Sequence, residues 1–194
     1  MTRLNKEYWN LRWQNQETGW DIGYESPAIC QYISQNVPKH SKLLIPGCGN
    51  AYEAEYLVAQ GYENITILDI SPVLVEKIKQ KFKQYPQVKV HCQDFFEHKG
   101  SYDYIVEQTF FCAIPQEWRP KYAEKTAELL AHQGKIIGLL FAKEFYNQTP
   151  PYGGTKAEYE QLFSKHFHLQ TIQLCENSIK PRKGAELFIV FVKK

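Results

Sequence analysis

Short apolar runs alternate with amphipathic segments along most of the chain. Apolar runs that end at Pro, Gly or a polar cluster predict buried strands, and apolar residues at helical spacing predict helices. Strands are expected at residues 42–46, 65–70, 88–91, 102–106, 135–141, 169–174 and 186–192. Helices are expected at residues 5–13, 27–36, 52–60, 71–84, 119–130 and 156–165.

The order of these elements predicts the fold class. Strands separated by helices with short connections are typical of a mostly parallel sheet that is covered on both faces. No helix is expected between the last two strands, so they predict an antiparallel hairpin at one edge. We therefore expect a single Rossmann-like α/β domain over residues 1–194, with a mostly parallel, seven-stranded sheet.

Composition narrows the class of protein. The 194 residues are 43% hydrophobic, which is enough for a substantial core, and the formal charge is only +2. That balance argues against an extended phosphate-binding surface and hence against nucleic acid as a partner. The chain has no apolar run of the roughly 20 residues that span a bilayer, and residues 1–13 lack the pattern of a secretory signal. We expect a cytoplasmic protein, and a monomer because no apolar helix face is left over.

The five cysteines are scattered and form no C-x-x-C pair, which favours reduced thiols over a disulfide framework. His166 and His168 flank Phe167 without an acidic or thiol partner at ligand spacing. We therefore expect no metal site.

Three loops that follow expected strands carry candidate chemistry, since ligands of open parallel sheets bind at the carboxyl ends of the strands. The first loop contains Gly47 and Gly49, but Tyr52 replaces the third glycine of the dinucleotide fingerprint. Glycine lets the backbone approach a ligand closely, although a plain structural turn also explains the pair.

The second and third loops contain acidic residues. Asp69 stands 20 residues after Gly49, where a carboxylate can accept hydrogen bonds from ribose hydroxyls; alternatively it caps the next helix. Asp94 is followed by Phe95 and Phe96, which suits an exocyclic amine and an adenine ring, although both phenylalanines also suit a core. A dinucleotide needs the full glycine fingerprint, whereas S-adenosylmethionine has no phosphate, so the loops favour methyl transfer over hydride transfer.

A fourth loop, residues 107–114, completes a series of motifs along nearly the whole chain. With these motifs the chain resembles the thiopurine methyltransferase superfamily, and within it the plant-type thiol and halide methyltransferases. The matching stretches are Trp9, Trp13 and Trp20, then LIPGCG (44–49), LDIS (68–71), DFF (94–96), FFCAI (110–114), LLF (139–141), PPY (150–152) and PRKG (181–184).

The resemblance implies a class I methyltransferase fold and S-adenosylmethionine as cofactor. It also implies that residues 1–26 form an aromatic lid, with Trp20 near the site of methyl transfer, and that position 108 lines the cofactor. The family has Arg or Tyr there and usually Asp at 107, whereas this chain has Gln108 and Glu107. The candidate cofactor-binding residues are Trp9, Trp13, Trp20, Gly47, Gly49, Asp69, Ile70, Asp94, Phe95, Glu107 and Gln108. The candidate substrate-side residues are Trp20, Arg119, Pro150, Pro151, Tyr152 and Arg182.

The expected reaction is in-line attack of a small soft nucleophile on the sulfonium methyl group, with S-adenosylhomocysteine as product. Aromatic rings attract a sulfonium cation and exclude water, although the tryptophans also suit a simple plug at the end of the sheet. Asp21, Glu107 or Tyr152 could take a thiol proton, but none has a spacing that requires this role, so we expect no dedicated base.

Three other functions remain open from the sequence. The first is methyl transfer to a larger acceptor, a nucleic acid or a protein. The string from Thr149 to Tyr152 is similar to the Asn-Pro-Pro-Tyr motif of amine-methylating enzymes, but it follows the fifth expected strand instead of the fourth. An NAD-linked reductase is disfavoured by the incomplete glycine fingerprint. The third alternative is a protein that binds the cofactor and serves as an interaction module without turnover. The departure from the family at Gln108 keeps this alternative open.

Overall fold

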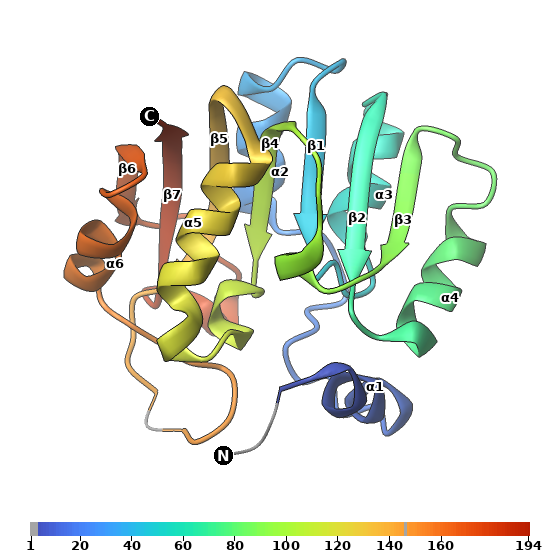
Figure 1. Cartoon of the computed structure of the whole chain (residues 1–194), viewed down its shortest axis with the longest axis horizontal. Coiled ribbons are helices and arrows are strands. Elements are labelled where there is room, and N and C mark those ends of the chain that lie inside the picture. Colours follow the sequence, from blue (N-terminus) through green and yellow to red (C-terminus); the bar gives the residue numbers. More distant parts are fainter. Residues whose placement is uncertain (1–3, 146) are drawn as a thin grey trace.

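The computed structural model describes residues 4–145 and 147–194. Its sheet has seven strands in the order β3-β2-β1-β4-β5-β7-β6 (Figure 1). The strands are β1 (Lys42–Pro46), β2 (Asn64–Asp69), β3 (Val88–Cys92), β4 (Tyr102–Gln108), β5 (Leu130–Phe141), β6 (Phe167–Leu174) and β7 (Glu186–Lys193). Strands β1 to β5 pair in parallel, and β7 pairs antiparallel with both β5 and β6. The expected mostly parallel sheet with an antiparallel edge hairpin is confirmed.

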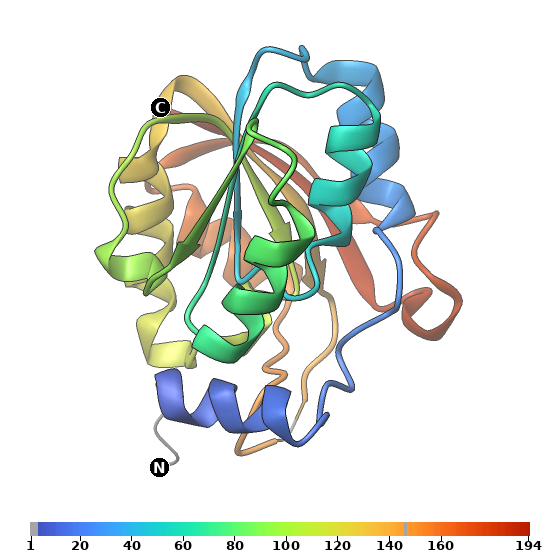
Figure 2. The same cartoon turned by 90° about the vertical axis from the view of Figure 1, so that its right-hand side faces the viewer.

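Helices cover both faces of the sheet (Figures 1 and 2). One core lies under α2, α3 and α4, and a second core lies under α5 and α6. The helices are α1 (Lys6–Gln14), α2 (Pro27–Asn36), α3 (Tyr52–Ala59), α4 (Pro72–Lys81), α5 (Arg119–Leu129) and α6 (Lys156–Phe163). Short 3-10 turns are η1 (Phe95–Glu97), η2 (Phe111–Ala113), η3 (Gln116–Trp118) and η4 (Lys180–Arg182). No described helix has the length and apolar character needed to cross a membrane.

The two cores explain why the strands read as apolar runs rather than as alternating patterns. In β4, Ile105 packs into the core under α5 and α6, whereas its neighbour Val106 packs into the other core. Because both faces are covered, successive residues are buried on opposite sides.

The largest boundary error lies between α5 and β5. The helix expected at residues 119–130 ends at Leu129, and β5 begins at Leu130 instead of residue 135, so Gly134 lies inside a strand. The pairing with β4 is irregular there, and Gln133 has a left-handed φ of 60°. Because the pairing is irregular, residues 131–134 can belong to the strand although their sequence is not that of a buried strand. Smaller differences occur at the end of α4, which stops at Lys81 instead of residue 84, and at the start of β6, which begins at Phe167 instead of residue 169.

Helix α1 lies across the carboxyl ends of the parallel strands (Figures 1 and 2). Its Asn10 Oδ1 accepts hydrogen bonds from Ser71 Oγ at 3.0 Å and from Val73 N at 3.1 Å, which attach α1 to the start of α4. None of its residues is buried. The first three residues of the lid expected at 1–26 lie outside the described residues.

Candidate active site

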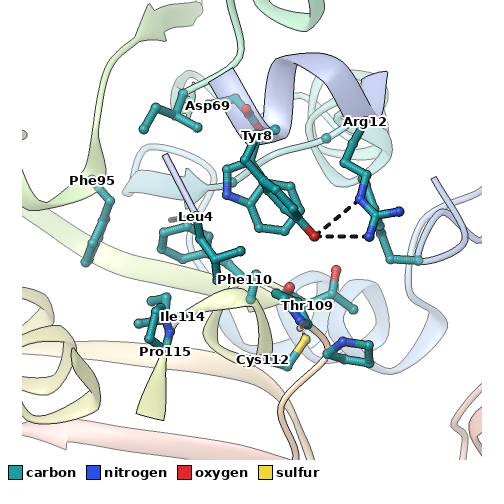
Figure 3. Close-up of a pocket in the computed structure, with 18 of the residues that line it drawn as sticks. Leu4, Tyr8, Arg12, Asp69, Phe95, Thr109, Phe110, Cys112, Ile114 and Pro115 are labelled. Carbon is teal, nitrogen blue, oxygen red and sulfur yellow. Dashed lines mark hydrogen bonds between the residues drawn. The ribbon is translucent and has the colours of Figure 1, made fainter. Parts of the chain in front are cut away.

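A cavity of about 430 Å³ separates the strand ends from the N-terminal segment (Figure 3). Most of the residues singled out from the sequence line this cavity. They are Trp9, Trp13, Trp20, Gly47, Gly49, Asp69, Ile70, Asp94, Phe95, Pro150, Pro151 and Arg182. Of the remaining candidates, Glu107, Gln108, Arg119 and Tyr152 do not line it.

The loop after β1 requires its glycines. Gly47 has a φ of 57° and Gly49 a φ of 53°, both in the left-handed region. A Cβ on Gly47 would collide with the ring of Phe110, and one on Gly49 would lie 3.8 Å from Trp13 Cζ2. The loop can therefore hold its backbone against the cavity only because no side chain stands there.

Asp69 lies at the end of β2, at the floor of the cavity. Burial raises the pKa of its carboxyl to about 6, and amide hydrogen bonds from Ser71, Gly49 and Ile70 oppose that rise. One of them joins Ser71 N to Asp69 Oδ1 at 2.9 Å. Above pH 6 Asp69 is mostly ionised, so it can accept hydrogen bonds from a diol.

Asp94 and Phe95 occupy the neighbouring strand end. Asp94 Oδ1 accepts a hydrogen bond from Phe96 N at 2.9 Å and caps η1. Phe95 is 2% exposed and its ring centroid lies 5.3 Å from that of Phe110. The Phe95 ring therefore belongs to the core and to the cavity wall at once.

The cover of the cavity consists of α1 and the segment that follows it. The ring of Trp20 meets Trp9 and Trp13 edge to face, with centroids 5.6 and 5.8 Å apart. Arg182 Nη2 donates to the Trp20 carbonyl oxygen at 2.8 Å, and Asp21 accepts a hydrogen bond from Asn50. These contacts hold the tryptophan cluster over the strand ends.

Glu107 lies beneath the loop that follows β4, not on the cavity. Its Oε1 accepts hydrogen bonds from Phe110 N at 2.9 Å and Phe111 N at 2.7 Å, and its Oε2 accepts one from the Tyr122 hydroxyl at 2.6 Å. The side chain is fully buried, and burial raises its pKa to about 7. Glu107 therefore stabilises a turn in which Thr109 has a left-handed φ of 57°.

Gln108 also lies off the cavity wall. Its Oε1 is buried and has no hydrogen-bond partner among the described residues. The cavity wall after β4 is formed by Thr109, Phe110 and Cys112 instead of by the residues expected at positions 107 and 108.

Arg119 and Tyr152 lie behind the substrate-side wall. Arg119 Nη2 donates to the carbonyl oxygens of Gly153 at 2.8 Å and of Tyr152 at 3.3 Å, and its guanidinium lies 4.7 Å from the centre of the Phe111 ring. Tyr152 N donates to the Cys112 carbonyl oxygen at 2.7 Å. Both residues therefore fix the loop that carries Pro150 and Pro151.

Tyr8, Arg12 and Trp118 also line the cavity wall, although no sequence motif pointed to them. Tyr8 and Arg12 stand four residues apart in the helix that was expected at residues 5–13, which is the spacing of side chains that touch. That signal was present in the sequence. In the described part of the chain, no group of three or more His, Cys, Asp or Glu side chains is placed to hold a metal ion.

Two solved structures share this fold over nearly the whole chain. A Burkholderia thailandensis 1,6-didemethyltoxoflavin-N1-methyltransferase with bound S-adenosylhomocysteine has a TM-score of 0.75 at 18% identity, over 97% of this chain and 89% of that chain. A Synechocystis magnesium protoporphyrin IX methyltransferase with bound S-adenosylmethionine has a TM-score of 0.74 at 16% identity, over 97% and 95%. The fold is that of the class I S-adenosylmethionine-dependent methyltransferases.

The particular family follows from the sequence relatives. A model of the thiopurine S-methyltransferase family matches residues 4–191, and the chain belongs to that family. Probable thiol methyltransferase 2 of Arabidopsis thaliana is 33% identical over 184 residues, 92% of this chain and 81% of the relative. Thiocyanate methyltransferase 1 of Brassica oleracea is 29% identical over the same shares, and a Vibrio cholerae thiopurine S-methyltransferase is 25% identical over 81% and 80%. The resemblance seen in the sequence motifs is confirmed.

The protein is thus a methyltransferase with S-adenosylmethionine as cofactor, and its own cavity fits that molecule. Asp69 offers a carboxylate for the ribose diol, and Asp94 with Phe95 offers a carboxylate and a ring for adenine. The tryptophans of the cover offer ring faces to a sulfonium cation. The cavity volume lies in the usual range for sites that enclose one small ligand.

Proposed function

We propose that the protein methylates a small soft nucleophile (a thiol, bisulfide, thiocyanate or a halide) by direct in-line displacement. The thiol and thiocyanate methyltransferases among its relatives support this acceptor class. The observation that carries the proposal is the wall at the acceptor end of the cavity, which is largely apolar apart from the Arg182 guanidinium, 5.6 Å from the centre of the Phe141 ring.

The strand order supports an assignment of the two ends of the cavity. Asp69 ends β2 and Asp94 follows β3, so we assign the adenosine part of the cofactor to that side of the cavity. The reacting methyl group then faces the other side, above β4 and β5. The wall there is formed by Thr109, Cys112, Phe141, Pro150 and Pro151. The whole cavity measures about 430 Å³ and must also hold the cofactor, so the space left favours a small acceptor over a nucleic acid or a protein side chain on a large surface.

S-adenosylmethionine supplies an electrophilic methyl group on a sulfonium. The chain's own part is to hold the two reactants together and to keep water out. The cluster of Trp9, Trp13 and Trp20 closes the cavity, and loss of water around a soft anion makes it more reactive.

No carboxylate among the described residues is placed to act as an unpaired base at the acceptor wall. Glu186 lies behind the wall, beside Cys112 and Phe141, and is paired with Arg182. The carboxylates that line the cavity are Glu17, Asp69 and Asp94, and Glu17 is paired with Arg12. Of the proton acceptors considered from the sequence, Glu107 is fully hydrogen-bonded, Tyr152 is off the wall and Asp21 is bonded to Asn50. A thiol with a pKa near ~8.5 is ionised to a useful degree in solution, so we expect the anion to bind directly.

The acceptor wall also contains a thiol of the protein itself, that of Cys112. Burial raises its pKa to about 12, and its Sγ–H donates to the Thr109 carbonyl oxygen at 3.2 Å. The Cys112 thiol therefore stays protonated and does not compete with the acceptor.

The proposal is tested by a sealed-vial assay of purified protein with S-adenosylmethionine and, separately, iodide, bisulfide, thiocyanate and an aromatic thiol. Methylated product in step with S-adenosylhomocysteine is expected for at least one small nucleophile. Binding of S-adenosylhomocysteine without turnover on any of them would instead support a larger acceptor or an interaction module. We also propose that the enzyme acts as a cytoplasmic monomer, without nucleic acid or membrane partners, and light scattering measures its mass in solution.

A further inference from the structure

Tyr8 and Arg12 of α1 form a pair on the cavity wall that no motif identified. The Arg12 guanidinium donates two hydrogen bonds to the Tyr8 hydroxyl oxygen, from Nη2 at 3.0 Å and from Nε at 3.3 Å. A third donor, Nη1, is bonded to Glu17 Oε2 at 3.0 Å. Both Tyr8 and Arg12 are half-buried, and both line the cavity.

The direction of these bonds determines where the Tyr8 proton points. A guanidinium is only a donor, so both bonds use the lone pairs of the Tyr8 oxygen. The single hydroxyl hydrogen must then turn away from Arg12, and no described residue accepts it in a hydrogen bond. In Figure 3 the Tyr8 hydroxyl extends from α1 into the cavity with Arg12 beside it. The positive charge of Arg12 polarises this O–H group and makes it a stronger donor.

The pair faces the acceptor end of the cavity. Asn10 attaches α1 to α4, which follows β2 on the adenosine side. Tyr8 and Arg12 stand two residues before and after Asn10, about 200° around the helix, and so point toward β4 and β5. Tyr8 also lies close enough to Tyr152 to add to the raised pKa of that phenol, after burial and Glu117.

We propose that Tyr8, held by Arg12, donates a hydrogen bond to the anionic nucleophile and thereby binds it in front of the methyl group. This inference rests on the proposed function. The Glu17 carboxylate balances the Arg12 charge, so the pair offers a directed donor rather than a free cation. A directed donor suits a monovalent soft anion such as thiocyanate, iodide or a thiolate.

The electron balance of the reaction predicts which kinetic constant changes. The anion's electron pair forms the new bond to carbon, and the carbon–sulfur bond breaks toward sulfur, so the nucleophile loses its charge during transfer. Tyr8 keeps its proton throughout. Its hydrogen bond is therefore stronger to the bound anion than to the transition state, and it contributes to KM more than to kcat.

The first test compares Y8F with the wild-type enzyme. Loss of one hydrogen bond to a charged group should raise the KM for thiocyanate about 10- to 100-fold, with kcat unchanged or slightly higher. The dissociation constant of S-adenosylhomocysteine, measured by calorimetry, should stay the same. Y85F, which alters an exposed tyrosine away from the cavity, is the matched control and should leave all three constants unchanged.

Two outcomes overturn the inference. One is an unchanged KM in Y8F, which would leave the proposed function intact. The other is weaker binding of S-adenosylhomocysteine by the same factor as the rise in KM, which would assign the pair to the cofactor.

A second test needs no turnover. Crystals of the complex with S-adenosylhomocysteine, soaked in iodide, should show anomalous density within hydrogen-bonding reach of Tyr8 Oη, and Y8F crystals should lack it. Iodide at Tyr8 in an enzyme that methylates none of the assayed acceptors would uphold the anion site while the proposed function fails. Wild-type crystals without iodide at Tyr8 would overturn the inference.

Discussion

The floor of the cavity, in which we include the Glu107 side chain that lies beneath it, is buried: Asp69 and Glu107 accept hydrogen bonds from neighbouring backbone amides. The cover above the cavity contains no buried residue of α1. The floor belongs to the two cores of the sheet. The cover is attached through polar contacts of Asn10, Asp21 and Arg182 and through the partly buried Trp13, which packs against the core under α2, α3 and α4. Floor residues should therefore determine whether the chain folds, and cover residues whether a ligand is retained.

The largest effect is expected for E107A on the floor. The substitution leaves the amides of Phe110 and Phe111 and the hydroxyl of Tyr122 without their acceptor. The free energy of unfolding, measured in urea, should fall by about 3–5 kcal/mol. E128A, which removes an exposed carboxylate paired with Lys125 on the same helix as Tyr122, is the control and should cost less than about 1 kcal/mol. Equal losses in both variants would show that the effect of E107A does not come from the buried hydrogen bonds of Glu107.

The pH dependence of stability tests the same carboxyl group. The pKa of Glu107 is about 7 in the folded chain and near ~4.3 when unfolded, so between these values the folded state holds more protons. The stability that Glu107 contributes therefore falls as the pH rises through this window. The unfolding free energy of the wild type minus that of E107Q should decrease by a few kcal/mol, in order of magnitude, from pH ~5 to ~7.5. Asp69 is present in both proteins, so the pH dependence that it contributes cancels in the difference. A flat difference would show that Glu107 is ionised at the lower pH.

A smaller effect, on ligand binding, is expected for D69N. The amide keeps an oxygen for Ser71 N but loses the charge that a ribose diol would meet. Calorimetry should show binding of S-adenosylhomocysteine weakened about 10- to 100-fold, which is the range for hydrogen bonds to charged groups. D103N is the control, because Asp103 accepts a bond from Lys42 N at the opposite end of the sheet. If D103N weakens binding as much as D69N, the loss is not local to the cavity.

The smallest change in stability is expected for N10A in the cover. It removes two partly exposed hydrogen bonds to the start of α4, so the unfolding free energy should change by no more than about 1 kcal/mol. Binding of S-adenosylhomocysteine should nevertheless weaken roughly 3- to 10-fold, because α1 would be released more often. A loss of stability comparable to that of E107A would show that the cover is part of the folding core.

The sequence predicted the floor better than the cover. Gly47, Asp69 and Asp94 follow strands, and the carboxyl ends of parallel strands meet at one edge, so strand assignment alone brings them together. In β4, Glu107 lies on the same face as Ile105, which is buried under α5. The strand expected at residues 102–106 stopped before Glu107, so its assignment to the cofactor came from the family resemblance alone.

Tyr8 and Arg12 could not be placed from the sequence because the position of α1 depends on tertiary contacts. The helix has no buried face, so no apolar stripe shows which side meets the protein. The bonds from Ser71 and Val73 to Asn10 fix its rotation, and they join segments about sixty residues apart. Helical spacing showed that Tyr8 and Arg12 could touch, but not what they would face.

The tryptophans described above give the enzyme a built-in optical signal. The chain has four, and all of them line the cavity: Trp9, Trp13, Trp20 and Trp118. Its intrinsic indole fluorescence therefore originates at the cavity wall rather than from the cores. Any ligand that enters, or any opening of α1, changes the surroundings of every emitter at once, so occupancy can be followed in real time without a label.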